Sequence, residues 1–144
     1  MASLNRFEDL ECWQEARKLV RQIYEITNRS KFSRDYELKN QIRRSAISVM
    51  ANTAEGFHRS SNKDFMKFLD YSRSSIAETL SHCYVALDQK YIEETELIDI
   101  KRQAEIIWRK INSLISYLKR NTTQASKTNL TNKTNKTNYT NQNS

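Results

Sequence analysis

The stretch from Gln41 to Arg59 reads Gln-Ile-Arg-Arg-Ser-Ala-Ile-Ser-Val-Met-Ala-Asn-Thr-Ala-Glu-Gly-Phe-His-Arg. At helical spacing it carries apolar residues on two sides, so we expect a helix that is more buried than its neighbours. We assign the first stripe to the core, and the second to the edge of the core or to a contact between subunits. The first stripe is Leu38, Ile42, Ala46 and Val49, and the second is Ile47, Met50 and Ala54, followed by Phe57.

The composition of the rest of the chain also favours helix. Its 144 residues include one glycine and no proline, so long apolar windows run without a helix breaker and few sites allow tight hairpins. A chain of this length forms one domain with a sizeable core. Four helical windows with short connections predict an all-α protein, an antiparallel up-down-up-down four-helix bundle. The windows end near residues 27, 56, 89 and 118.

Apolar residues at spacings of three and four predict which side of each remaining helix is buried. In the first helix they are Trp13, Ala16, Val20, Ile23 and Thr27. In the third they are Phe65, Leu69, Ser72, Ile76, Leu80 or Thr79, Cys83 and Leu87. In the fourth they are Leu97, Ile100, Ala104, Ile107, Ile111, Leu114 and Leu118. Phe32, alone in a polar connection, is expected to pack against the end of the bundle.

Residues 121–144 differ in composition from the preceding 120 residues, which we take as the bundle domain. They repeat a Thr-Asn-x triplet that has too few apolar side chains to offset the entropy lost on ordering, so we predict a disordered tail. The tail contains three lysines and no acid, whereas residues 1–120 have 21 basic and 17 acidic residues, a net charge of +4. The triplets are interpreted as neutral sequence drift, with a basic arm for RNA as the alternative.

The expected location is the cytoplasm. The first residues lack the apolar core of a signal peptide, and no window reaches the roughly 18 apolar residues of a membrane span. Cys12 and Cys83 stand apart from any ligand-like neighbour, so we interpret both as reduced, buried thiols.

No catalytic constellation can be assembled from the sequence, and we predict a protein without enzymatic activity, cofactor or metal. His58 and His82 are the only histidines, and a single glycine rules out a glycine-rich phosphate loop. Polar residues at the end of the second helix are given structural roles instead. Asn52 and Glu55 are expected to pair with donors at the turn that follows, and Gly56 fits the left-handed position after a helix end.

A group of cations is the candidate nucleic-acid site. Lys63 and Lys67 lie one turn apart at the start of the third helix, where exposed backbone N–H groups attract anions. The alternative is a solvated face on which Asp64 or Asp70 pairs with Lys67. No aromatic ladder interleaves with these cations, so stacking of single-stranded bases has little support. The candidate residues are Arg43, Arg44, Arg59, Lys63 and Lys67.

Residues from about 7 to 118 resemble the bacterial four helix bundle proteins encoded in intervening sequences of large-subunit ribosomal RNA genes. The run from Gln41 to Gly56 is the most specific part of the resemblance. The other matching pieces are Phe7-Glu8-Asp9-Leu10, Trp13-Gln14, Tyr36-Glu37-Leu38, Ser60 or Ser61, Phe65 and Phe68-Leu69. Two positions depart from the pattern: Ser33 stands where a proline is usual, and Arg73 lies within a segment that is usually small.

The resemblance implies a non-enzymatic bundle that assembles into a homopentameric barrel and associates with RNA. Related bundles serve as accessory proteins of diversity-generating reverse transcriptases, which makes an adaptor for such an enzyme the alternative function. The resemblance implies no catalytic residues. Without an apolar span we expect no membrane partner, and the expected partners are other copies of this chain, structured RNA and a reverse transcriptase.

Overall fold

The computed structural model describes residues 5–140, and the side chains from 5 to 122. Over that range the protein has four α-helices, two short 3-10 helices and no strand, which confirms the all-α prediction. The elements are η1 (Phe7–Asp9), α1 (Glu11–Thr27), η2 (Phe32–Arg34), α2 (Tyr36–Phe57), α3 (Asn62–Asp88) and α4 (Glu94–Thr140).

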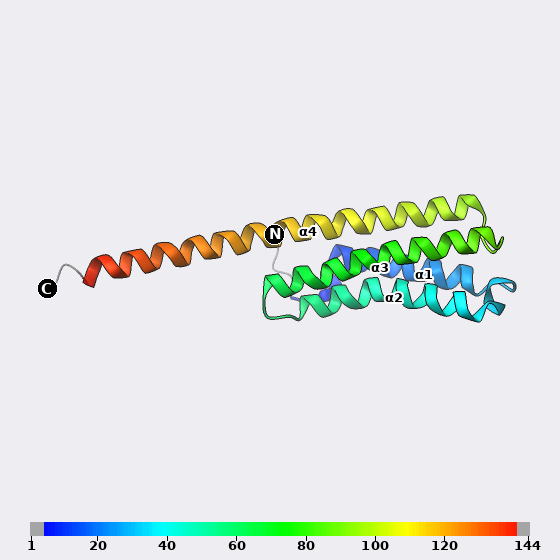
Figure 1. Ribbon diagram of the computed structural model, residues 1–144, viewed down its shortest axis with the longest axis horizontal. Helices are drawn as coiled ribbons and strands as arrows, with labels where there is room; N and C mark the ends of the chain where they lie inside the picture. Colours follow the sequence, from blue (N-terminus) through cyan, green and yellow to red (C-terminus); the bar gives the residue numbers. More distant parts are fainter. Residues whose placement is uncertain (1–4, 141–144) are drawn as a thin grey trace.

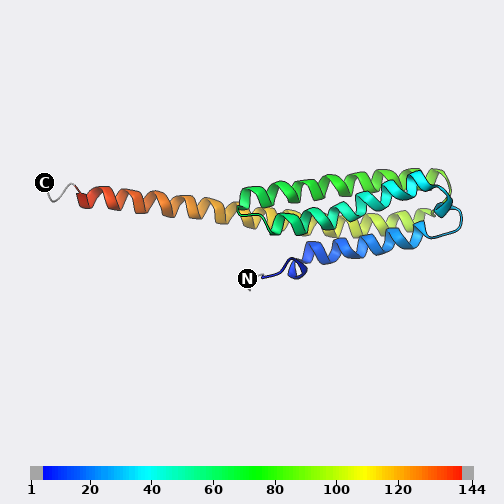
Figure 2. The same cartoon turned by 90° about the horizontal axis from the view of Figure 1, so that it is seen from below.

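The helices lie side by side, and their connections gather at two ends (Figures 1 and 2). At one end, the α1–α2 connection meets the α3–α4 connection: the rings of Phe32 and Tyr91 stack with centroids 4.9 Å apart. The Tyr91 hydroxyl donates to Asp35 at 3.0 Å, and the Asp35 side chain also caps α2 by accepting from the backbone N–H of Leu38. At the other end, η1 lies against the α2–α3 connection, where Phe7 contacts His58 edge to face.

The core follows the predicted stripes, with shifts of one residue. The first stripe of α2 is buried, as predicted, and Phe32 is fully buried. In α4, Ile115 is buried and Leu114 is only partly so. In α3, Thr79, the predicted alternative to Leu80, is buried, and Ala86 is buried in place of Leu87. These shifts arise because a straight helix turns every 3.6 residues, so a strict heptad pattern drifts around its surface.

The buried side of α1 is rotated from the prediction. Trp13 and Val20 are partly buried at its margin, and the Trp13 ring packs edge-on against Phe7 with centroids 5.2 Å apart. The α1 residues that are buried are Cys12, Ala16, Leu19, Ile23, Ile26 and Thr27.

Helix α4 extends past Leu118, where the predicted apolar spacing ends. Helix α4 runs without a break from Glu94 to Thr140, and its last part projects past the other three helices (Figure 1). No proline or glycine interrupts it, and adding a residue to an existing helix is far easier than starting one. Among the described side chains, the hydrogen bond from Asn62 to Thr122 is the contact between α4 and another helix that lies farthest along α4. Residues 141–144 lie outside the described range.

No helix in the described part of the chain combines the length and the apolar character needed to cross a membrane.

Helices α2 and α3 pack closely through a seam of small hydroxyl residues. Thr53 and Ser72 are joined at 3.0 Å, Ser75 donates to Ser48 at 2.8 Å, and Thr79 donates to Ser45 at 2.8 Å. Ser72 also donates to the carbonyl of Val49 at 3.0 Å. Arg73, the unusual residue of this segment, faces α4 instead, where it donates to Asn112 at 2.9 Å. Helices α2 and α3 therefore pack closely even though Arg73 lies in a segment that is usually small.

Gly56 belongs to this seam, and its predicted left-handed conformation is wrong. It lies inside α2, and no described glycine has a positive φ. A Cβ placed on Gly56 would come within 2.8 Å of both Phe65 Cδ2 and Phe68 Cβ. Glycine is required here because α3 approaches the backbone of α2, and not because of the backbone conformation.

The left-handed position is at Lys90, after α3, with a φ of 63°. The N–H of Tyr91 donates to the carbonyl of Ala86, and the N–H of Lys90 donates to that of Leu87, both at 2.9 Å. This pair of bonds is a Schellman motif, which usually has glycine at the position of Lys90.

We predict that Gly56→Ala lowers the free energy of unfolding by about 1 kcal/mol, because the strain of overpacking exceeds the gain in helix propensity. Urea denaturation measures the change. Ala51→Gly, at an exposed position of the same helix, reports the propensity difference alone. A Gly56→Ala protein more stable than the wild type would contradict the close approach of α3.

We predict that Lys90→Gly raises the free energy of unfolding by about 1 kcal/mol, because glycine adopts a positive φ without steric cost. The neighbouring Gln89 has a φ of −80°, so Gln89→Gly should give no gain. Thermal denaturation of the two variants side by side tests the difference, and equal shifts would disprove the assignment.

Candidate functional site

Arg43 is committed to the interior contacts of the bundle. Its Nε donates to Thr27 Oγ1 and its Nη2 to Asn28 Oδ1, both at 2.8 Å, and the guanidinium lies 4.2 Å from the centre of the Tyr24 ring. These contacts hold the C-terminus of α1 against α2. Two of the five N–H donors of the Arg43 guanidinium are therefore used within the protein, which makes Arg43 the weakest member of the candidate RNA-binding set.

Arg44 is exposed and separate from the other cations. It lies 13 residues before the end of α2, which is about 20 Å along the helix axis. The structure does not bring it to the start of α3, and any contact it makes with a nucleic acid is at a distance from the other cations.

Arg59 follows the end of α2, and Lys63 and Lys67 lie in the first turns of α3; we call these three residues the cation cluster. Arg59 pairs with Glu55 at 2.7 Å, and its guanidinium lies over the Phe68 ring, 4.4 Å from the centroid. Lys63 and Lys67 are exposed, and neither forms an ion pair within residues 5–122. The alternative, in which Lys67 pairs with Asp64 or Asp70, is not observed: neither acid forms an ion pair with Lys67, and Asp70 pairs with Arg73 at 2.7 Å.

Of the two polar residues assigned to the turn after α2, only Glu55 contacts it. Glu55 accepts from Arg59, which lies in the turn. Asn52 does not reach the turn: its Nδ2 donates to the carbonyl and hydroxyl oxygens of Ser48, one helical turn back, at 2.9 and 2.8 Å. The Asn52 amide therefore extends the polar seam between α2 and α3.

The residues of the second stripe of α2 differ in how exposed they are. Ile47 has 41% of its surface exposed, which leaves it available for contact with another molecule. Met50 is partly buried and packs against the core. Ala54 is half-buried. Of the proposed subunit contacts, Ile47 alone is well exposed.

An apolar groove between α3 and α4 was missed in the sequence. Ile98 and Trp108 are 48% and 40% exposed, although they lie outside the spacing of the α4 core residues. The groove has a volume of about 410 Å³ and is lined by Ile76, Leu80, Ile98, Lys101, Arg102, Ala104, Glu105 and Trp108. Large apolar residues off the core stripe of α4 are the signal that would have indicated it.

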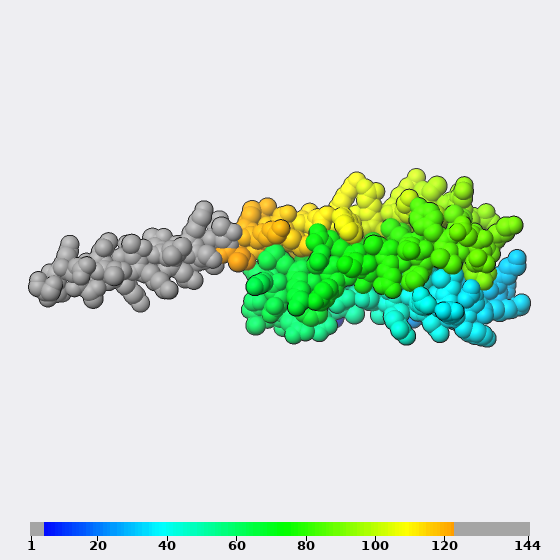
Figure 3. All heavy atoms as spheres, in the orientation of Figure 1, coloured from blue at the N-terminus to red at the C-terminus, as the bar shows by residue number. Residues whose placement is uncertain are grey.

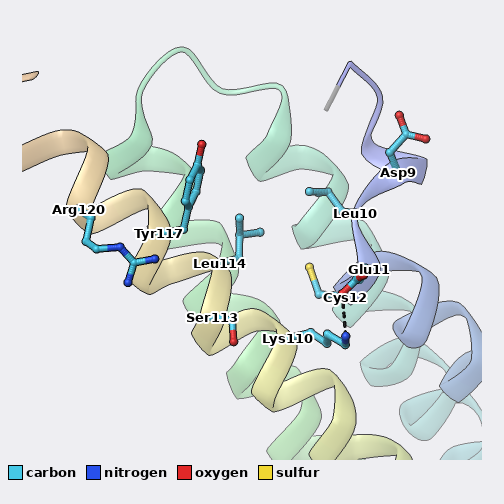
Figure 4. A pocket seen from close by; sticks show the side chains of 9 residues that line it. All are labelled: Asp9, Leu10, Glu11, Cys12, Lys110, Ser113, Leu114, Tyr117 and Arg120. Atoms are coloured by element: carbon cyan, nitrogen blue, oxygen red, sulfur yellow. Dashed lines mark hydrogen bonds and ion pairs between the residues drawn. The ribbon is translucent and has the colours of Figure 1, made fainter. Parts of the chain in front are cut away.

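A second pocket, of about 460 Å³, lies between the start of α1 and α4. Leu10 and Cys12 face Leu114 and Tyr117 across it (Figure 4). The Glu11–Lys110 ion pair, 2.7 Å long, bridges it. Its interior is mainly apolar, and it does not contain a nucleophile paired with a base.

The thiols are poor nucleophiles. Burial raises the pKa of Cys12 to about 11 and that of Cys83 to about 12, so both are protonated at neutral pH. Among the described residues, no group of three or more His, Cys, Asp and Glu side chains is arranged to hold a metal ion.

Comparison with known proteins places these features in context. The family model for the 23S rRNA-intervening sequence protein matches residues 8–113. A solved structure of a protein of unknown function from the S23 ribosomal protein family of Bacteroides thetaiotaomicron is similar in fold. The two structures superpose with a TM-score of 0.65 and share 20% sequence identity. The match covers 72% of this chain and 97% of the Bacteroides protein. The comparison with curated proteins found no match.

Proposed function

The chain belongs to the 23S rRNA-intervening sequence protein family, and on that premise we propose that it is a non-enzymatic, oligomeric, RNA-associated protein of the cytoplasm. The observation that carries the RNA association is the cation cluster. Three basic residues lie within nine positions of one another around the α2–α3 connection, and two of them have no ionic partner in the described part of the chain.

The cluster suits the phosphate backbone of RNA better than a small anion. Its side chains are exposed along one surface instead of enclosing a pocket, so they can contact successive phosphates. Ammonium groups that lack a carboxylate partner release counterions from the nucleic acid without first breaking an ion pair. Arg44 lies apart from this cluster on α2, and Arg43 is held by its contacts with α1.

Self-association is supported by exposed apolar surface on two different faces. The groove between α3 and α4 presents Ile98 and Trp108, and α2 presents Ile47. A ring of identical subunits needs two complementary surfaces on each subunit, since each contact joins unlike faces. We propose that these faces join up-down-up-down bundles into a homopentameric barrel.

The groove also supports a second candidate function, an adaptor that binds another protein such as a reverse transcriptase. Partly exposed Trp residues are enriched at protein interfaces. The two candidates differ in what fills the groove: another copy of the chain in the first, and an unlike protein in the second. If a reverse transcriptase co-purifies with the monomeric protein, and no longer does so with the Ile98→Glu variant, the adaptor function is favoured.

We predict that Lys63→Gln/Lys67→Gln weakens binding of a structured RNA at least tenfold at low salt, because two phosphate contacts are lost. The dependence of log K on log salt concentration should become shallower by about 1.5. Fluorescence anisotropy at several salt concentrations measures both effects.

The matched control for this test is Lys31→Gln/Lys90→Gln, which removes two exposed lysines at the opposite end of the bundle. It should leave affinity and salt dependence unchanged. If the wild type shows no salt-sensitive binding of RNA, the proposed RNA association is wrong.

We predict that Ile98→Glu dissociates the oligomer without unfolding the subunit, since a charge at an exposed apolar contact must lose its water when the interface forms. Light scattering gives the mass and circular dichroism the helix content. Ser81→Glu, at an exposed position of α3, should leave the mass unchanged. A wild-type protein that is a monomer at all concentrations would contradict self-association.

A further inference from the structure

Aromatic rings extend the cation cluster along α3. Phe68 and Tyr71 meet edge to face, with centroids 5.5 Å apart and planes at 80°. Arg59 covers the Phe68 ring at 4.4 Å. Tyr71 has 43% of its surface exposed. The three side chains thus form a row that begins at the α2–α3 connection and ends on an accessible ring. The spacing of aromatic residues along the sequence did not indicate this row, because Arg59 and Phe68 meet only through the turn between α2 and α3.

Tyr71 also shares a stripe with the two unpaired lysines. Lys63, Lys67 and Tyr71 are spaced four residues apart, so they follow one another along one face of α3 at about 6 Å intervals. This helix lies across the front of the molecule in Figure 3, between α2 and α4. Asp70, the acid adjacent to Tyr71, pairs with Arg73. The stripe therefore presents two ammonium groups followed by an accessible ring.

We propose that this stripe binds an unpaired segment of RNA, with Tyr71 as the platform on which a base stacks and with Lys63 and Lys67 on the neighbouring phosphates. The inference rests on the proposed RNA association and adds the class of RNA. Lysines alone bind single strands and duplexes through the phosphates. An exposed ring adds free energy only when the face of a base is accessible.

A duplex cannot use the platform, since its bases are stacked on one another and their faces are covered. Phe68 and Arg59 support the Tyr71 ring. The edge-to-face contact between Phe68 and Tyr71 limits the rotation of the Tyr71 ring, and the Arg59 guanidinium holds the Phe68 ring in place. Tyr71 is thus a specificity-determining residue, whereas the lysines supply affinity for any RNA.

The test compares the full chain and its variants for binding to a labelled oligouridylate, whose bases stack little on one another, and to a blunt duplex of the same length. We expect Tyr71→Ala to weaken binding of the single strand by about 5- to 150-fold, the range found when a stacking ring is removed. Binding of the duplex should change by less than about twofold, because its bases are already stacked. Tyr71→Phe keeps the ring and should bind like the wild type.

The matched control is Tyr84→Ala, which removes another exposed tyrosine of α3. Tyr84 has 46% of its surface exposed and lies about 20 Å along the helix from Tyr71. It should leave both affinities unchanged, and circular dichroism verifies that every variant is folded. If Tyr71→Ala has no effect, or weakens both RNAs equally, the stacking platform is wrong while RNA association stands. If the wild type binds neither RNA, the proposed function fails and this inference with it.

Discussion

The close packing of α2 on α3 is the constraint on which the rest of the structure depends. Their interface is built from hydroxyl residues whose side chains bond to one another across the seam, such as Ser45 with Thr79 and Thr53 with Ser72. A buried hydroxyl without a partner is costly. In the observed register the Thr53–Ser72, Ser48–Ser75 and Ser45–Thr79 pairs all form within 3.0 Å, and Phe65 and Phe68 lie where a Cβ on Gly56 would clash. The seam therefore fixes the register of the two helices as well as their distance.

That register places the candidate site. Because α2 and α3 are held in one alignment, the short connection between them leaves Arg59 directly over the ring of Phe68. Lys63 and Lys67 follow on the outer face of α3, and Tyr71 comes one turn later. The residues that could meet RNA are exposed, but their arrangement is set by hydroxyl groups on the opposite side of the same helix.

The proposed RNA-binding and assembly surfaces are separate. The cation cluster lies on α3 near the α2–α3 connection, whereas the apolar groove lies between α3 and α4 and is centred on Ile98 and Trp108. A charged surface remains hydrated until it meets phosphates, and an apolar groove favours contact with another apolar surface. This separation allows a ring of subunits to form while each subunit keeps its cations accessible.

The sequence by itself determined the fold class and most of the core. The absence of proline, a single glycine and regular spacing of apolar residues were sufficient for four helices, because helix formation and burial of one face are local consequences of sequence. The same reasoning failed for α4, where it predicted an end near residue 118. Thr and Asn are weak helix formers, but nothing in the sequence forces a stop.

Only the tertiary structure decided the roles of individual polar and small residues. Arg43 and Arg44 are adjacent and chemically alike, yet Arg43 is bonded to the end of α1 and Arg44 is exposed. Gly56 looked like a helix cap and is instead a point of contact with two phenylalanines. Such roles depend on which side chains of another helix lie within a few ångströms. That depends on how the helices are rotated and aligned, which the spacing of apolar residues along one helix does not specify.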